Sequence, residues 1–283
     1  MAQAPDRSPW GERERTKLIK AIKEFKPIDS SVTTARILLL GPFGVGKSSF
    51  VNSVFSIFRG SISNPAYAGN PTSEFRTHSI SVEEGTSLNL ALCDTMGLSE
   101  KKGAGLHSDD IVSIIQGHVP DGYQADPPMT PETDGYVAAP TPDEMIHCVV
   151  YVMDASTVSD VSAHLKKKLR EIRQRVTSLK IPQLVLMTKV DRADPSVIKN
   201  IRKVDQSEII REKKKQLAAL LDVPISCIFP VKNYVPDDLE LNDNCDVLLL
   251  MAVNEMKRRT DPSVNDIIRR LSALSTRCPP DLK

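Results

Sequence analysis

One eight-residue stretch, GPFGVGKS at positions 41–48, restricts the possible folds of this chain more than any other feature. It fits the pattern G-x-x-x-x-G-K-[ST], in which glycines let the backbone curl so that its N–H groups face phosphate oxygens. A short apolar run at 34–40 precedes the stretch, and a helical pattern at 47–58 follows it. Strand, glycine-rich turn and helix together are the setting that a phosphate-binding loop requires.

The side chains of this loop have separate expected roles. Lys47 would reach the β- and γ-phosphates, and the hydroxyl of Ser48 would bind Mg²⁺, a hard cation that prefers oxygen ligands. We expect the nucleotide to be contacted by Gly41, Phe43, Gly44, Val45, Gly46, Lys47, Ser48 and Ser49. A phosphate-binding loop does not by itself distinguish ATP from GTP, so the choice of base must be read elsewhere in the chain.

Strand-like and helix-like segments alternate along the rest of the chain. Strands are expected at 34–40, 75–82, 88–93, 146–153, 183–187 and 226–231, and helices at 12–25, 47–58, 159–178, 206–221 and 245–259. This alternation predicts an α/β fold with a mostly parallel, doubly wound sheet, helices on both faces and right-handed crossovers. The segments 75–82 and 88–93 are expected to form an antiparallel pair. In such a sheet, ligands bind beyond the carboxyl ends of the strands.

One main domain is expected, over residues 31–260. Residues 1–30 contain an amphipathic helix that should pack on this domain, and residues 261–283 form a short helical tail. Residues 117–144 hold six prolines and three glycines without periodicity, which predicts a long surface insertion. A binding loop and a disordered segment both stay open as interpretations of this insertion.

The composition gives no reason to expect a polyanionic partner. The chain has 37 Lys and Arg against 36 Asp and Glu, and a net charge of +1 creates no global field for nucleic acid or anionic lipid. Its apolar runs are far shorter than the roughly 20 residues that cross a bilayer, and a secretory signal is not recognisable, so a cytoplasmic location is expected. Five widely spaced cysteines without a Cys-x-x-Cys pair predict buried thiols rather than a zinc site.

A second motif, CDTMG at 93–97, ends the expected strand 88–93. The carboxylate of Asp94 could hold the magnesium shell, and the N–H of Gly97 could sense the γ-phosphate. The threonine that closes over magnesium should lie between the helix at 47–58 and the strand at 75–82, and Thr72 and Thr77 fall in or near that interval. Thr72 is better placed, because its neighbours predict a loop. We therefore expect Ser48, Asp94 and Thr72 at the metal, and Lys47, Thr72 and Gly97 at the catalytic centre.

A third motif, TKVD at 188–191, follows the expected strand 183–187 at the same edge of the sheet. The carboxylate of Asp191 can accept hydrogen bonds from the ring N–H and the exocyclic amino group of guanine, a donor pair that adenine lacks. Lys189 would lie along the ring, and Lys232, after the last strand, could close over the base. GTP or GDP with Mg²⁺ is therefore the expected ligand, and an ATP-dependent enzyme is disfavoured.

Taken in order, GPFGVGKSS, CDTMGLSE and TKVD resemble the interferon-induced protein 44 and 44-like family of P-loop GTPase-like proteins. HVPDGYQ at 118–124 adds to the likeness, which covers residues 30–260. The resemblance implies a Ras-like G domain in a cytoplasmic, interferon-inducible protein of antiviral or immune regulation. A threonine where many GTPases have asparagine in TKVD is similar to dynamin-like GTPases.

Hydrolysis is expected to be slow. Ras-like enzymes orient the attacking water with a glutamine directly after the glycine of the second motif, and here that residue is Leu98. His107 is one candidate for supplying the missing group. The expected mechanism is a switch in which GTP and Mg²⁺ draw the segments near Thr72 and Gly97 inward, where protein partners read them.

A scaffold or interaction protein is the alternative function. Such a protein would keep the fold and act through the insertion at 117–144 or the basic helix at 159–178. A loop that had lost nucleotide binding would be expected to lose Lys47 or Ser48, and both are present. Dimerisation across the nucleotide face is a further possibility, and the protein partners are not identified by any motif.

Overall fold

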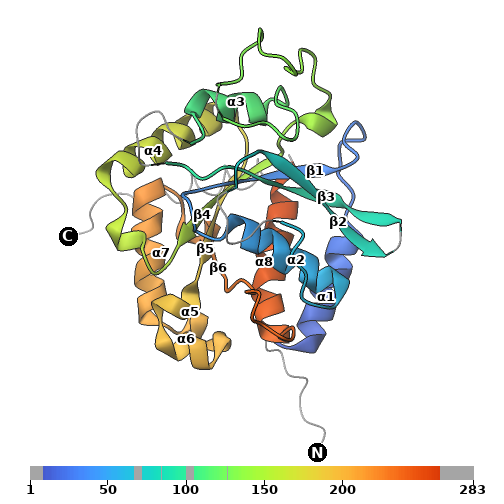
Figure 1. Ribbon diagram of the computed structural model, residues 1–283. Coiled ribbons are helices and arrows are strands. Elements are labelled where there is room, and N and C mark those ends of the chain that lie inside the picture. Colours follow the sequence, from blue (N-terminus) through green and yellow to red (C-terminus); the bar gives the residue numbers. More distant parts are fainter. Residues whose placement is uncertain (1–8, 67–71, 84, 100–104, 126, 262–283) are drawn as a thin grey trace, which may run out of the picture.

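A six-stranded sheet with the order β2-β3-β1-β4-β5-β6 forms the centre of the computed structural model (Figure 1). The structure describes residues 9–66, 72–83, 85–99, 105–125 and 127–261. The strands are β1 (Ala35–Leu40), β2 (Arg76–Glu83), β3 (Thr86–Asp94), β4 (Cys148–Asp154), β5 (Gln183–Thr188) and β6 (Ile228–Pro230). β1 and β4 lie in the middle and are buried almost throughout, which explains their nearly continuous apolar sequences.

The strand pairing sets the position of the three sequence motifs. β1 pairs in parallel with β3 and β4, β4 with β5, and β5 with β6. β2 lies antiparallel to β3 at the edge of the sheet, so the predicted antiparallel pair is confirmed. Because the carboxyl ends of parallel strands meet at one edge, the segments after β1, β3 and β5 converge there.

Helices cover both faces of the sheet (Figure 1). α1 and α2 contact α8 on one face, whereas α4 contacts both α3 and α7 on the other. The longer helices are α1 (Glu12–Lys23), α2 (Lys47–Arg59), α3 (Ser108–Ile115), α4 (Ala163–Ser178), α7 (Glu208–Leu221) and α8 (Asp243–Arg259). The strand order and the two helical layers are those of a P-loop G domain, as the sequence predicts.

Several short elements are absent from the sequence prediction. They are α5 (Val190–Ala193), α6 (Pro195–Lys199), and the 3₁₀ turns η1 (Pro142–Glu144), η2 (Val158–Asp160), η3 (Ile201–Asp205) and η4 (Ile225–Cys227). α3, at eight residues, was also not predicted. Elements of this length show too few turns for a helical period to be recognised in the sequence. The predicted helical tail lies outside the described residues beyond position 261.

The N-terminal helix α1 packs against α8 as an integral part of the molecule. Leu18 and Ile22 of α1 belong to the hydrophobic core, with 6% and 1% of their surface exposed. The Nε of Arg15 donates to a carboxylate oxygen of Asp246 at 2.6 Å. The Nζ of Lys257 donates to the carbonyl of Ala21 at 3.0 Å. Apolar burial and two polar contacts therefore fix this helix on the domain.

The described part of the insertion at 117–144 is packed onto the domain. Phe75 and Tyr123 share a backbone hydrogen bond of 2.8 Å, and the N–H of Gly122 returns a second one to Phe75, also at 2.8 Å. The N–H of Met129 donates to the carboxylate of Asp110 at 3.0 Å, and the side chain of Met129 is buried. These contacts hold the described residues of the insertion against the domain.

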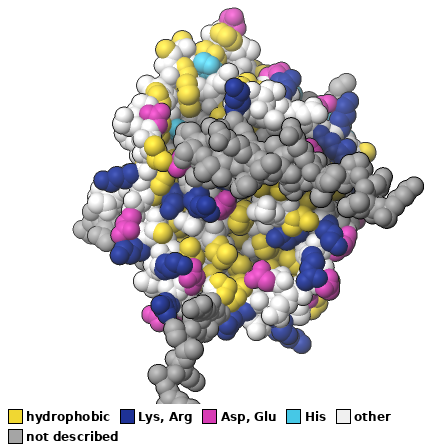
Figure 2. All heavy atoms as spheres, turned by 180° about the vertical axis from the view of Figure 1, so that it is seen from behind, with side chains coloured by type: hydrophobic (Ala, Val, Ile, Leu, Met, Phe, Trp, Pro, Cys, Tyr) yellow, Lys and Arg dark blue, Asp and Glu magenta, His cyan; other side chains and the backbone are white. Residues whose placement is uncertain are grey.

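The surface carries mixed charge. On the face opposite to that of Figure 1, basic and acidic side chains are interspersed (Figure 2), in keeping with a net charge of +1. Within the described ranges, no helix combines the length and the apolar character needed to cross a bilayer. Cys93, Cys148 and Cys227 are buried free thiols, and so is Cys245.

Truncating the apolar face of α1 is expected to destabilise the whole domain. The Ile22→Ala variant should lose about 2–4 kcal/mol of unfolding free energy, because it leaves a cavity in a packed core. Ile28, with 67% of its surface exposed, offers the matched control, and Ile28→Ala should stay within about 0.5 kcal/mol of the parent protein. Urea denaturation followed by circular dichroism measures both; equal losses would show that α1 is not part of the cooperative unit.

Candidate functional site

The phosphate-loop sequence connects β1 to α2 and is shaped by its glycines. Gly46, the residue before α2, has a φ of 96°, a left-handed conformation that other L-residues rarely adopt. A Cβ at this position would also come within 2.9 Å of the Nδ2 of Asn233. Both the backbone angle and the close neighbour therefore require glycine at position 46.

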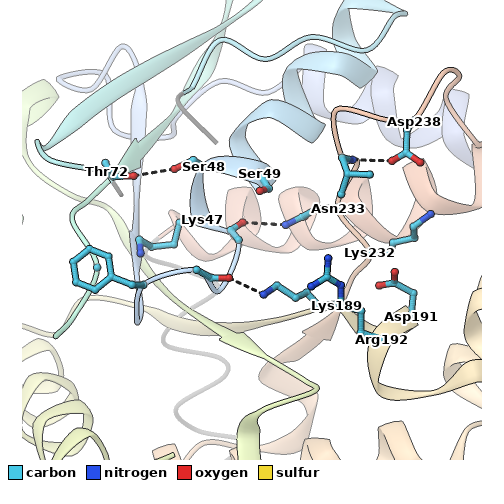
Figure 3. Close-up of a pocket in the computed structure, with 15 residues that line it drawn as sticks. Lys47, Ser48, Ser49, Thr72, Lys189, Asp191, Arg192, Lys232, Asn233 and Asp238 are labelled. Carbon is cyan, nitrogen blue, oxygen red and sulfur yellow. Dashed lines mark hydrogen bonds between the residues drawn. The ribbon is translucent and has the colours of Figure 1, made fainter. Parts of the chain in front are cut away.

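Hydrogen bonds from outside the loop hold three consecutive loop carbonyls. Lys189 Nζ donates to Gly44 O at 2.7 Å and Asn233 Nδ2 to Gly46 O at 2.9 Å (Figure 3). Thr188 Oγ1 donates to Val45 O at 2.6 Å. In a trans peptide the N–H points opposite to the carbonyl. These bonds therefore turn the N–H groups of the next residues, Val45, Gly46 and Lys47, away from the anchoring side chains and towards the hollow of the loop.

Lys47 lies at the bottom of this hollow and is almost completely buried, with 6% of its surface exposed. Its Nζ donates to the carbonyls of Gly41 and Pro42, each at 3.1 Å. Burial lowers the pKa of Lys47 from its ordinary value of 10.5 to about 8, against the opposing attraction of Asp94. A buried ammonium group with only carbonyl partners is well placed to gain energy from an anion in the hollow.

Three oxygen-bearing side chains meet beside Lys47. The Oγ of Ser48 donates to a carboxylate oxygen of Asp94 at 2.5 Å and lies 3.0 Å from the Oγ1 of Thr72. Burial raises the pKa of Asp94, and the Ser48 hydrogen bond and the Lys47 charge act in the opposite direction. A hard divalent cation prefers such oxygens, and its charge would compensate the burial of the carboxylate. The donor set therefore fits Mg²⁺.

The structure also distinguishes the two candidate threonines. Thr72 contacts Ser48, as described above. Thr77 lies on β2, and its hydroxyl donates to the carboxylate of Asp121 at 2.8 Å, away from the phosphate loop. Only Thr72 is therefore positioned to close over a cation bound at Ser48.

The second motif contacts the phosphate loop directly. A Cβ on Gly97 would lie 2.5 Å from the Cγ of Phe43, so the half-exposed Phe43 ring requires glycine there. The N–H of Leu98 donates to the carbonyl of Gly41 at 3.0 Å, and the Leu98 side chain is 1% exposed. His107 caps the N-terminus of α3 and does not line the cavity at the loop. Neither Leu98 nor His107 thus reaches the hollow.

A cavity of about 480 Å³ extends from the phosphate loop to the ends of β5 and β6 (Figure 3). Its lining consists of Phe43, Gly44, Gly46, Lys47, Ser48, Ser49, Thr72, Gly97, Lys189, Asp191, Arg192, Lys232, Asn233, Val235 and Asp238. Among the residues predicted from the sequence, Gly41, Val45 and Asp94 lie behind this lining. The fold therefore brings the three motifs and Lys232 to one cavity.

Sequence reasoning missed several participants. Arg192, Val235 and Asp238 line the cavity, and no motif marks them in the sequence. Asp154 was also missed: its carboxylate accepts from the Nζ of Lys189 at 2.7 Å. Asn233, the residue after Lys232, holds the carbonyl of Gly46. An acid at the end of a buried central strand was the available signal for Asp154.

Comparison with curated proteins confirms the resemblance stated above. The chain is 36% identical over 260 residues to human "Interferon-induced protein 44-like", covering 89% of this chain and 57% of that protein. It is 35% identical over 260 residues to human "Interferon-induced protein 44", with 89% and 58% covered. The mouse "Interferon-induced protein 44" is 35% identical over 257 residues, with 88% and 60% covered. The chain thus spans less than two thirds of the length of these relatives.

Solved structures resemble the chain in fold only. One is described as a probable GTP-binding protein engB, with 17% identity, a TM-score of 0.44, and 79% of this chain and 99% of that chain covered. Another is a dimerization-deficient mutant of Toc33 from Arabidopsis thaliana, with 17% identity, a TM-score of 0.48, and 88% and 93% covered. No family model matches the chain.

The buried lysine predicts a pH dependence of stability in the absence of nucleotide. The pKa of Lys47 is about 8 in the folded protein against 10.5 ordinarily, so the unfolded chain binds more protons between these values. The unfolding free energy contributed by Lys47 should therefore rise with pH across this window, by on the order of 1–3 kcal/mol. Denaturation of the parent protein and Lys47→Met at pH 7.5 to 10 is expected to show this extra rise only in the parent; parallel profiles would contradict it.

Proposed function

Because this chain is homologous to the interferon-induced protein 44 proteins over 260 residues, we propose that it is an interferon-induced guanine-nucleotide-binding switch. It would hold GTP or GDP with Mg²⁺ and hydrolyse GTP slowly, in antiviral or immune regulation in the cytoplasm. One observation carries the proposal: a single cavity has the buried Lys47 at one end and Asp191 at the other.

At the phosphate end, this chain supplies positive charge and oriented N–H groups. Lys47 would exchange its two carbonyl partners for phosphate oxygens, which offer charge-assisted hydrogen bonds of greater strength. The N–H groups of Val45, Gly46 and Lys47 face the same hollow, and the N-terminus of α2 adds its dipole. Ser49, the second residue after Lys47, also lines the cavity.

The oxygen cluster beside Lys47 would hold the cation. Ser48 would bind Mg²⁺ directly, Asp94 through its shell, and Thr72 from the segment that closes over it. When bound, Mg²⁺ neutralises charge that develops on the phosphate oxygens. Thr72 and Gly97 both line the cavity, so a γ-phosphate bound there can draw both segments inward.

At the base end, a carboxylate and a lysine support guanine recognition. Asp191 can accept two hydrogen bonds from guanine, whereas adenine offers an acceptor at the corresponding ring nitrogen. Lys189 is held by Asp154 and by the Gly44 carbonyl, so its aliphatic part is fixed beside the base position. Lys232 lines the cavity near Asp191 (Figure 3). These contacts favour GTP over ATP.

Binding measurements test the proposal directly. Titration calorimetry with Mg²⁺ should show GTP and GDP binding, weaker ATP binding, and none for Lys47→Ala. The Asp191→Asn variant should lose roughly tenfold to a hundredfold in GTP affinity and little in ATP affinity, because a charged acceptor of two hydrogen bonds is removed. The guanine preference should therefore fall.

Asp205 provides the matched carboxylate, since it is exposed and lies outside the cavity lining. Asp205→Asn should leave both affinities unchanged. Equal or tighter binding of ATP by the parent protein would overturn the choice of base. Failure of every nucleotide to bind would favour the scaffold function on the same fold.

Slow hydrolysis follows from the position of Leu98, not only from its chemistry. Since its side chain is packed in the core, Leu98→Gln should bury an amide without restoring water orientation. We expect a loss of about 2–4 kcal/mol in unfolding free energy and no gain in GTP turnover. Leu239, with 93% of its surface exposed, provides the control Leu239→Gln, which should change neither quantity. A faster turnover of Leu98→Gln in a phosphate-release assay would contradict this account.

A further inference from the structure

The segment between β6 and α8, residues 231–242, forms much of the wall at the base end of the cavity. We refer to it as the base-side loop. Lys232, Asn233, Val235 and Asp238 of this loop all line the cavity. Regular secondary structure is absent from the loop, so its position depends on a small number of contacts.

Tyr234 is the anchor of the base-side loop. Its backbone N–H donates to the Oγ of Ser53 in α2 at 2.8 Å, which holds this part of the loop against α2. Its hydroxyl donates to a carboxylate oxygen of Asp246 in α8 at 2.6 Å and accepts from the N–H of Asn242 at 2.7 Å. The ring therefore joins the start of the loop to its end and to α8.

The carboxylate that holds Tyr234 depends in turn on α1. Asp246 is completely buried, and its second oxygen accepts from the Nε of Arg15 at 2.6 Å. The Nε of Arg15 also lies 3.6 Å from the Oδ1 of Asp243, whose side chain is half exposed. Burial raises the pKa of Asp246, whereas the hydrogen bonds from Tyr234 and Arg15 and the charge of Arg15 oppose this rise. Removing Arg15 would therefore favour the protonated carboxyl, which accepts less well from Tyr234.

We propose that Arg15, Asp246 and Tyr234 are positioning residues through which the N-terminal helix α1 holds the base-side loop against a bound nucleotide. The inference rests on the proposed function for its ligand, guanine nucleotide. It goes beyond that function because it gives α1, which lies outside the cavity, control over how long the nucleotide stays bound. Any partner that pulls on α1 would thereby speed nucleotide release.

Loss of Arg15 has a defined physical consequence. Asp246 would remain buried with only the Tyr234 hydroxyl as a side-chain partner, and it would take up a proton or recruit water. Either change weakens the hydrogen bond that Tyr234 donates. The base-side loop then keeps its bond to Ser53 but loses its link to α8, and the side chains that line the base end of the cavity are held less firmly.

Release of a fluorescent GDP analogue, mant-GDP, tests the proposal in the full chain. Arg15→Ala and Tyr234→Phe should each release mant-GDP roughly tenfold faster than the parent, the range expected for coupling through a packed network. Arg15→Lys keeps a cation near Asp246 and should restore much of the parent rate. Lys257→Met removes a different contact between α8 and α1, the bond to the Ala21 carbonyl, and should leave the rate unchanged.

Two results would overturn the proposal: a parent-like rate in Arg15→Ala, or the same acceleration in Lys257→Met, which would indicate general loosening of α1. If the parent protein binds no nucleotide, the proposed function fails. The anchoring of the loop by α1 is then tested by hydrogen exchange of residues 231–242 without ligand. Faster exchange in Arg15→Ala than in Lys257→Met would then support the anchoring of the loop by α1. Equal exchange in both would refute it.

Discussion

The site depends first on the tethering of three consecutive carbonyls of the phosphate loop to side chains from other parts of the chain. Thr188 and Lys189 come from the end of β5, and Asn233 comes from the base-side loop. These bonds restrict the rotation of the loop peptides, and the N–H of Phe50 adds a helical bond to the carbonyl of Gly46 at 2.9 Å. Lys189 and Asn233 also line the base end of the cavity, so the same residues shape both of its ends.

Burial of opposite charges is the second constraint. Lys47 and Asp94 are both almost fully buried, and burial shifts each pKa towards the neutral form while their mutual attraction opposes the shift. Phosphate and Mg²⁺ would supply the missing counter-charges to Lys47 and Asp94 respectively. The site thus holds polar groups that a nucleotide and its cation would satisfy better than the protein does, which would favour binding.

The two sides of the cavity are supported differently. The phosphate side is built on β1, α2 and the end of β3, and is backed by the hydrophobic core. The base side relies on the base-side loop, whose Tyr234 reaches α1 through Asp246 and Arg15. A switch needs a stable part and a part whose position can be biased by a small free energy. The core-backed elements of the phosphate side would be the stable part, whereas the base-side loop and the segments at Thr72 and Gly97 would be the parts that move.

The sequence by itself determined the fold class, the three motifs and most residues of the cavity, because glycine spacing and strand periodicity are local properties of the chain. It favoured Thr72 over Thr77 because the neighbours of Thr72 predict a loop, but only packing shows that the Thr72 hydroxyl lies beside Ser48. No motif marks Arg192 or Asp238, and the available signal for Asp154 is an acid at the end of a buried strand. The sequence also could not show that Leu98 faces the core. The contact between Asp154 and Lys189 and the link from Arg15 through Asp246 to Tyr234 join residues far apart in the chain. Only the tertiary structure brings such residues within hydrogen-bonding distance.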